Sequence, residues 1–294
     1  MRIRRTLLYI PGNSPNMIVN AAVLGADGIV LDIEDAVSPK DKDAARILIR
    51  NALGWVDRSR LEFCVRINDV NTPYWKKDLS VVVPANPDAL LIPKVEFPEE
   101  LAQVDEFVTK LEHESDLPDG RIKLFPILET AMGIENSYII AASRHERLDA
   151  LLLGAEDLAT SLGALRTDSG EEIAYGRSRM VNAARAANLM PIDTAYANID
   201  NIDGFISDTR LSRQLGYAGR AVISPRQVSP ANTIYSPSES DIRYAGEVIT
   251  IMEEAKKAGK GAVSRRGKMI DGPMITRARH VLEFAKHIQW ESDE

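Results

Sequence analysis

The sequence predicts an α/β fold, a closed (β/α)8 barrel followed by a C-terminal helical extension and lid. Short runs rich in Val, Ile and Leu recur, amphipathic segments separate them, and the runs end roughly 30 residues apart, as in strands joined by crossover helices. The 294 residues suit one large barrel, so we assign 1–235 to the barrel and 236–294 to the extension and lid. The alternative is an open doubly wound sheet, which would have one crevice and not polar residues after nearly every strand.

Each strand is predicted from a short apolar run, and each helix from apolar residues that return at steps of three and four. The expected strands are 7–10, 29–33, 63–67, 89–92, 123–128, 150–153, 190–194 and 221–223. The clearest helices between them are 42–53, 99–114, 176–187 and 203–215. Beyond the eighth strand, a charged helix is expected at 238–258 and a last helix from about 273 to 288.

Composition excludes several classes of protein. With 36 Lys and Arg against 43 Asp and Glu, the net charge of −7 argues against a nucleic-acid binder that uses a basic surface. One cysteine excludes an internal disulfide framework and a cysteine-rich metal site. Because no apolar run reaches about 18 residues, we expect no membrane span and a cytoplasmic location.

Polar residues follow nearly every predicted strand. They are Asn13, Glu34, Asp35, Arg66, Asn68, Lys94, Glu129, Glu156, Asp157, Asp193 and Ser224. In a barrel, the carboxyl ends of all strands form one rim, so residues far apart in sequence converge there. We therefore predict a site at this rim, with Asn13, Glu34, Asp35, Arg66 and Lys94 as substrate-binding candidates.

Glu129 and Asp157 follow consecutive strands and are the predicted metal ligands. Neighbouring parallel strands lie about 4.8 Å apart, so two carboxylates at their ends can share one cation. Oxygen ligands of this kind suit Mg²⁺. The alternative is that these carboxylates pair with Arg or Lys, and spacing alone leaves open whether Glu156 or Asp157 faces inward.

Arg66 and Lys94 are the two cations expected at the rim. The planar guanidinium of Arg66 could bind a substrate carboxylate or stabilise an oxyanion, unless it forms a structural ion pair with Glu34 or Asp35. Lys94 could form a Schiff base if it were desolvated, and the alternative is a solvated or ion-paired lysine.

A glycine-rich basic segment, 256–268, joins the last two predicted helices and carries six positive charges and no acid. Such a segment is either a solvated linker or a mobile lid over the barrel mouth that attracts phosphate.

Motifs along the whole chain resemble one known family. The runs LLYIPGN, GADGIVLDIEDAVSPKDKDAAR, VRIN, LIPKVE, ILETAMGIEN, LLLGAEDLA and GKMIDGP occur in the order typical of the citrate lyase β-subunit family, within the HpcH/HpaI aldolase superfamily. The resemblance implies a TIM barrel, an Mg²⁺ site and retro-Claisen cleavage of a thioester.

The resemblance also assigns residues. It makes Glu129 and Asp157 the metal ligands and Arg66 the substrate-binding arginine, and it places Glu34 and Asp35 behind the metal-bound waters. Asp271 matches a lid aspartate that reaches the site of an adjacent subunit in relatives, where it would protonate an acetyl enolate. From the residues alone, a helix N-cap is the preferred interpretation of Asp271. Ser224 departs from the pattern, because many relatives carry His or Asn there.

The expected reaction is cleavage of a citryl thioester, on acyl-carrier protein or CoA, to oxaloacetate and an acetyl thioester. Expected partners are the α and carrier subunits of a citrate lyase and further copies of this chain, as a homotrimer or higher oligomer. The alternatives are a malyl-CoA or citramalyl-CoA lyase, a Lys94 Schiff-base aldolase, and a non-catalytic assembly subunit.

Overall fold

The computed structural model describes residues 2–58, 61–143, 146–257, 263–265 and 268–293. The chain divides into two compact units. One unit is Arg4–Asn232, and the other is Thr233–Glu294 together with Met1–Ile3.

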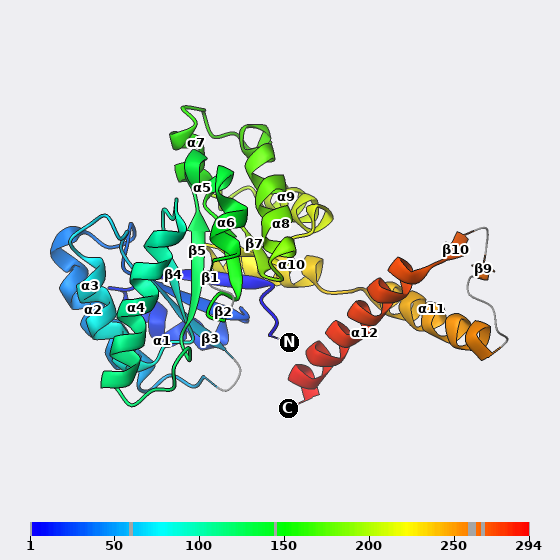
Figure 1. Cartoon of the computed structure of the whole chain (residues 1–294), viewed down its shortest axis with the longest axis horizontal. Helices are drawn as coiled ribbons and strands as arrows, with labels where there is room; N and C mark the ends of the chain where they lie inside the picture. Colours follow the sequence, from blue (N-terminus) through cyan, green and yellow to red (C-terminus); the bar gives the residue numbers. More distant parts are fainter. Residues whose placement is uncertain (1, 59–60, 144–145, 258–262, 266–267, 294) are drawn as a thin grey trace. The chain divides into compact units, whose positions relative to one another are not determined.

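Eight parallel strands close a barrel in the first unit, and they follow one another around it in chain order (Figure 1). The strands are β1 Thr6–Pro11, β2 Gly28–Asp32, β3 Glu62–Arg66, β4 Ala89–Ile92, β5 Lys123–Leu128, β6 Ala150–Leu153, β7 Met190–Asp193 and β8 Gly219–Val222. Pairing of β8 with β1, for example Val222 with Leu8, closes the ring. The predicted barrel is therefore confirmed, and strand ends agree within two residues. The largest difference is at β8, where Gly219 and Arg220 pair with β7 through backbone groups that need no apolar side chain.

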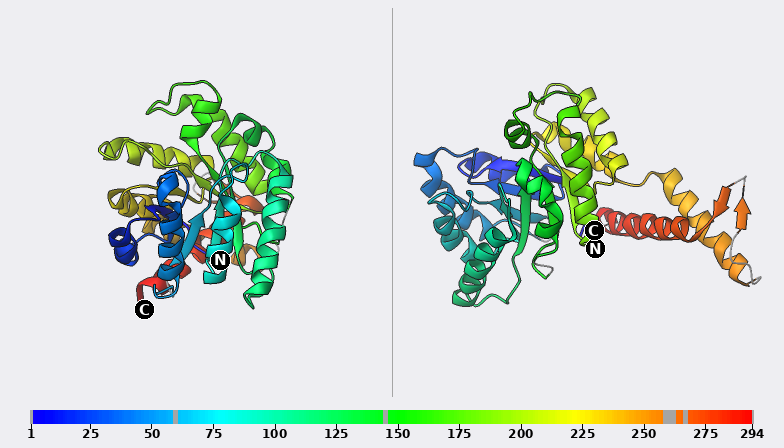
Figure 2. Two further views of the ribbon diagram at one scale, coloured as in Figure 1. Left: turned by 90° about the vertical axis from the view of Figure 1, so that its left-hand side faces the viewer. Right: turned by 45° about the horizontal axis from the view of Figure 1, so that its top comes forward.

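Helices lie around the outside of these strands (Figure 2). They are α1 Pro15–Asn20, α2 Lys42–Leu53, α3 Trp75–Val82, α4 Pro98–Glu114, α5 Ala131–Glu135, α6 Ser137–Ala141, α7 Ala155–Ser161, α8 Ala174–Ala186, α9 Ile202–Leu215 and α10 Pro225–Tyr235. Short 3-10 turns occur at Ala21–Val23, Pro39–Asp41, Val83–Ala85 and Glu171–Ile173. In α4 the buried residues Leu101, Val104, Val108 and Leu111 recur at steps of three and four, which is the pattern that predicted the helix.

Alternate strand residues face the barrel interior, because successive side chains of a strand point to opposite faces. The interior cluster consists of Leu7, Val30, Cys64, Ala89, Leu91, Phe125, Ile127, Ala150, Leu152 and Ile192. Two residues further along, the same alternation predicts an inward layer at the carboxyl ends of the strands. Its members are Tyr9, Asp32, Arg66, Glu129, Gly154 and Thr194. This layer is the floor of the site.

The amino end of the barrel is closed by an ion pair. Arg4 is 3% exposed and donates to both carboxylate oxygens of Glu62, at 2.5 and 2.8 Å. Its guanidinium also pairs with Asp149 and lies 4.8 Å from the centre of the Phe125 ring. The barrel interior is therefore filled from one end to the layer that carries the site.

The second unit contains two helices, α11 Glu239–Lys257 and α12 Gly272–Asp293, which pack through Ala245, Val248, Met252 and Ala278. Both helices are predicted by the sequence. The sequence does not predict β9 Val263–Arg265 and β10 Lys268–Ile270, which pair antiparallel within the basic segment. Residues 258–262 and 266–267 of that segment lie outside the described residues, so its action as a lid stays a prediction. Among the described helices, none is long and apolar enough to cross a membrane.

Candidate active site

A cavity of about 210 Å³ opens at the carboxyl ends of the strands, where the sequence predicts the site. Its lining includes Tyr9, Asp35, Arg66, Ile127, Glu129, Leu153, Gly154, Ala155, Glu156, Asp157, Thr194, Ala195, Ala221 and Ile223. A larger hollow of about 400 Å³ beside Arg147 lies near the start of β6, at the opposite end of the barrel. There the guanidinium is already bonded to Asp105, Thr109 and Glu112, so we place the site in the smaller cavity.

Arg66, the last residue of β3, is fixed by two carboxylates. Its Nε and Nη2 donate to the two oxygens of Asp32 at 2.8 and 2.6 Å, and its Nη1 lies 2.9 Å from Oε2 of Glu34. Burial opposes its charged form, but the hydrogen bonds and charge of Asp32, together with Tyr9 and Glu34, outweigh burial and raise the pKa of Arg66 well above its usual value. The guanidinium also lies 5.3 Å from the centre of the Tyr9 ring. Arg66 thus lines the cavity as a fixed cation. It also forms the structural ion pair with Glu34 that was the alternative to substrate binding.

Asp32 is a residue that sequence reasoning missed, because the run 29–33 is interpreted only as a buried strand. Asp32 is an inward carboxylate at the end of β2 and pairs with Arg66, whereas the sequence predicted Glu34 or Asp35 as the partner of Arg66. The alternation of side chains along a strand could have identified Asp32. Val30 faces the barrel interior, so Asp32, two residues later, also faces inward.

Lys94 follows β4 and has a left-handed backbone, with φ of 55°. Its backbone N–H donates to Oε1 of Glu129 at 2.9 Å, and its Nζ donates to Oε1 of Glu34 at 2.6 Å. The same Nζ lies 3.6 Å from Asp157 and 4.0 Å from Asp35. Burial lowers the pKa of Lys94, but the hydrogen bond and charge of Glu34, together with the charges of Glu129 and Asp35, outweigh burial, and the net shift is upward. A protonated amine does not attack a carbonyl, so the structure favours the ion-paired lysine over a Schiff-base lysine.

Glu129 follows β5 and is only 3% exposed. Burial, and then the charges of Glu34 and Asp157, raise its pKa to about 8. Gly154 makes room for this carboxylate, because a Cβ at that position would lie 2.2 Å from Oε2 of Glu129. A bound cation would relieve the repulsion between these acids.

The two acids that follow β6 lie in the first turn of α7 and have different partners. Asp157 approaches Lys94, whereas Glu156 pairs with Arg166 at 3.2 Å. The geometry therefore favours Asp157 as the neighbour of Glu129. The described residues contain no group of three acids, histidines or cysteines that could hold a metal. A pair of carboxylates fits Mg²⁺, which usually takes one or two carboxylates and completes its shell with water or substrate.

Other predicted residues lie at different distances from this centre. Asn13 is exposed beyond β1, and Asp35 is exposed at the cavity edge. Ser224 follows β8, where its Oγ accepts a hydrogen bond from the N–H of Arg226. Asp193 does not face the cavity as expected of a rim residue. It points outward to Arg177 at 2.5 Å, because the inward position of β7 belongs to Ile192.

Asp271 belongs to the second unit, directly before α12. Its Oδ1 accepts a hydrogen bond from the N–H of Met274 at 3.0 Å, which is the geometry of a helix N-cap. The structure therefore accounts for this residue locally, and proton donation by Asp271 stays a prediction.

Comparison with known proteins identifies one family. A family model described as HpcH/HpaI aldolase/citrate lyase matches residues 5–225. Citrate lyase subunit beta of Leuconostoc mesenteroides subsp. cremoris is 39% identical, over 97% of this chain and 94% of the relative. Mitochondrial citramalyl-CoA lyase of Mus musculus is 34% identical, over 97% of this chain and 87% of the relative. The crystal structure of CitE from Mycobacterium tuberculosis, in complex with magnesium, acetoacetate and coenzyme A, has a TM-score of 0.79 and 27% identity and covers 97% of this chain and 100% of that one.

Proposed function

Because the chain belongs to the HpcH/HpaI aldolase/citrate lyase family, we propose that it cleaves a citryl thioester to oxaloacetate and an acetyl thioester. The family resemblance expected from the sequence is confirmed, and the protein is an enzyme of the lyase class. The observation that carries the specific reaction is 39% identity to a citrate lyase β subunit over 97% of this chain. The cavity supports it, because Arg66, Glu129 and Asp157 all line it.

Glu129 and Asp157 are the residues that would hold Mg²⁺. Their fit is supported by the raised pKa of Glu129, by the space that Gly154 leaves for its carboxylate, and by the neighbour crystallised with magnesium. When bound, Mg²⁺ supplies positive charge that stabilises negative charge developing on substrate oxygens.

The cations of the chain itself are suited to the oxo-acid half of the substrate. Arg66 is held against Asp32 and Glu34, so it presents a positive charge to the cavity without having to reorganise. Lys94 adds a second positive charge, held by Glu34. We assign these two residues to the carboxylates of the acyl group.

Cleavage needs two proton movements. As the carbon–carbon bond breaks, the substrate hydroxyl releases its proton to solvent and becomes the oxo group of oxaloacetate, and the bonding electrons go to the acetyl-thioester enolate. The enolate then takes a proton at carbon. Asp271 of a neighbouring copy is the candidate donor, which requires the predicted homotrimer or higher oligomer. A carrier protein or CoA as thioester carrier, association with α and carrier subunits, and the cytoplasmic location also stay predictions.

A citramalyl-CoA lyase is the second candidate, supported by the mouse relative. The purified chain should be assayed with citryl-CoA, citramalyl-CoA and malyl-CoA, in Mg²⁺ and in EDTA, with detection of the oxo-acid product. We expect Mg²⁺-dependent turnover, fastest with citryl-CoA. Turnover that persists in excess EDTA, or borohydride trapping of substrate on Lys94, would contradict the proposed mechanism. A folded protein that cleaves none of the three would be an assembly subunit.

Three variants test the metal ligands. Glu129→Gln and Asp157→Asn should each lose nearly all turnover. Glu156→Gln is the matched control, because Glu156 lies beside Asp157 but pairs with Arg166, and it should keep turnover within about threefold.

A further inference from the structure

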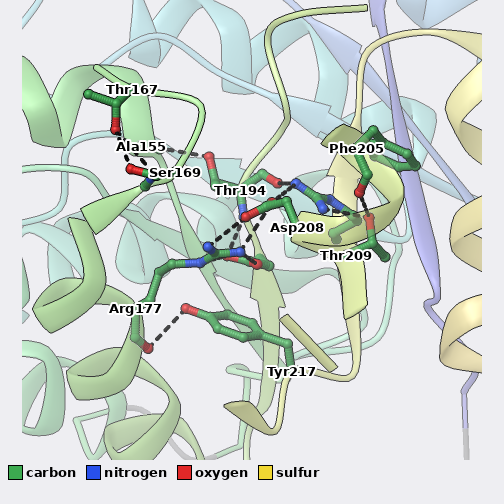
Figure 3. Close-up of polar contacts among 12 residues, drawn as sticks. Ala155, Thr167, Ser169, Arg177, Thr194, Phe205, Asp208, Thr209 and Tyr217 are labelled. Carbon is green, nitrogen blue, oxygen red and sulfur yellow. Dashed lines mark hydrogen bonds and ion pairs between the residues drawn. The ribbon is translucent and has the colours of Figure 1, made fainter. Parts of the chain in front are cut away.

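Thr194 follows β7 at the cavity, and both of its backbone polar groups are fixed from outside the barrel (Figure 3). Its N–H donates to Oδ1 of Asp193 at 2.9 Å, and its carbonyl accepts from Nη2 of Arg220 at 2.9 Å. Because both partners are side chains, the position of Thr194 depends on them as well as on the strand ladder.

The partners of Thr194 belong to a buried network of charges between β7, β8, α8 and α9. Arg177 pairs with Asp193 at 2.5 Å and with Asp208 at 2.8 Å, and Arg220 pairs with Asp208 at 3.0 Å. Both arginines are at most 2% exposed. Desolvating such charges is costly, whereas a well-bonded network of this kind makes the groups attached to it rigid. The network therefore holds the end of β7 at a fixed place beside the cavity.

The side chain of Thr194 faces the cavity, and it is only partly satisfied by the protein. Its Oγ1 accepts a hydrogen bond from the N–H of Ala155 at 3.0 Å (Figure 3). A hydroxyl also carries one hydrogen to donate, and within the described part of the chain no acceptor is found for it. Thr194 is 3% exposed, and it faces inward because Ile192, two residues earlier, is in the interior cluster.

The lining from the ends of β6 and β8 beside Thr194 is mostly apolar, with Leu153, Ala155, Ala221 and Ile223. Glu156 and Asp157 also line the cavity, but among the described residues neither accepts a hydrogen bond from Thr194. Leaving a buried donor without a partner is costly, so an oxygen of a bound ligand would stabilise this arrangement. The charged groups Arg66 and Lys94 come from β3 and from the residues after β4, so Thr194 provides a neutral donor from a different part of the ring.

We propose that Thr194 is a substrate-binding residue, whose hydroxyl donates a hydrogen bond to a carboxylate oxygen of the oxo-acid half of the acyl group. This inference rests on the proposed function, because it requires a 2-oxo acid as product. The ligand class is a 2-oxo acid carboxylate such as that of oxaloacetate. Ala155 fixes the hydroxyl oxygen and the network fixes the backbone, so the donor is oriented before the substrate binds.

The test is calorimetric titration of oxaloacetate into the protein in saturating Mg²⁺, with Mg²⁺ titrated alone as a second measurement. Thr194→Val removes the hydroxyl at nearly constant shape, and Thr194→Ser keeps it. We expect Thr194→Val to bind oxaloacetate about tenfold to 100-fold more weakly, as for loss of a hydrogen bond to a charged group. Thr194→Ser should stay within about threefold of wild type, and both variants should bind Mg²⁺ within about twofold of wild type.

Thr109→Val is the matched control. Thr109 is a half-buried threonine on α4 whose hydroxyl accepts a hydrogen bond from Arg147, in a separate ion-pair network away from the cavity lining. Its loss should lower the melting temperature and leave oxaloacetate affinity unchanged. A purely structural role for Thr194 would give that same result.

Each outcome is decisive. Unchanged oxaloacetate affinity in Thr194→Val, or an equal fold-loss of Mg²⁺ affinity, would overturn the inference, because Thr194 would then serve only to hold α7. If Thr194→Val does not fold, Thr194→Cys replaces it, since a thiol is a weaker donor, and unchanged affinity would again overturn the inference. If wild type cleaves thioesters and binds oxaloacetate, and the Thr194 variants bind oxaloacetate equally well, only the proposed role of Thr194 is refuted. Wild type that neither binds a 2-oxo acid nor cleaves a thioester removes the proposed function and this inference together.

Discussion

Replacing Glu129 with Gln should make the metal-free protein more stable at alkaline pH while it removes Mg²⁺ binding. Glu129 is buried near two acids, Glu34 and Asp157, and two cations, Arg66 and Lys94, and the net effect raises its pKa from 4.5 to about 8. Between these two values the folded protein keeps a proton that the unfolded chain has released. The free energy of unfolding therefore falls as pH rises from about 4.5 to about 8. Above that range Glu129 is ionised in both states and causes no further fall.

The size of the effect follows from the pKa. At about 1.36 kcal/mol per pKa unit, the shift of Glu129 corresponds to about 5 kcal/mol. Glutamine does not titrate, and its side-chain oxygen can still accept the hydrogen bond from the N–H of Lys94. We expect Glu129→Gln and wild type to be similarly stable below about pH 4.5, and the variant to be more stable by up to about 5 kcal/mol above pH 8.

Urea unfolding in EDTA at pH 5, 7 and 9 measures this difference, and a repeat in Mg²⁺ should stabilise wild type and not the variant. Glu112→Gln is the matched control, because Glu112 is also fully buried but is paired with Arg147 and accepts from the N–H of Ile122. Removing its charge leaves part of the Arg147 charge unpaired and should destabilise the protein by about 2–4 kcal/mol at pH 9. If Glu129→Gln is less stable than metal-free wild type at pH 9, the burial argument for Glu129 is wrong.

Three further predictions concern Gly154, Arg66 and Asp271. Gly154→Ala would push a Cβ to 2.2 Å from the carboxylate of Glu129, so kcat/KM and Mg²⁺ affinity should each fall about tenfold or more, and unchanged Mg²⁺ titrations would show that Glu129 is not confined by this contact. Arg66→Lys should lower kcat/KM about 100-fold, because an ammonium cannot replace a planar fork held by two carboxylates, whereas near-normal kinetics would make Arg66 structural only. Asp271→Asn should keep the melting temperature of wild type, because Asn caps helices as well as Asp, but it should lose turnover. If Asp271 donates its proton to the site of another copy, subunit exchange between Asp271→Asn and Glu129→Gln should restore part of the turnover. No recovery of turnover after demonstrated exchange would refute that donation.

Periodicity and strand spacing predicted the barrel strands and the clearest helices of this protein. Strand and helix bounds follow from short apolar runs and from apolar residues at three- and four-residue steps, which depend on local chain geometry. The parallel order and the crossover spacing then require all strand ends to meet at one rim, so the sequence alone places Glu129, Lys94 and Arg66 there. In the structure Arg66 and Glu129 line one cavity, and the N–H of Lys94 donates to Glu129. The ordered motifs added the family.

Only the tertiary structure decided which polar side chains face that site and in which charge state. Asp157 and Glu156 are adjacent in sequence, yet one approaches Lys94 and the other pairs with Arg166. Asp193 is turned outward and Thr194 inward, a distinction of one residue that depends on the phase of the strand pleat in the closed barrel. The raised pKa of Glu129 depends on burial and on acids about 95 and 28 residues away in sequence, which only the closed barrel brings together.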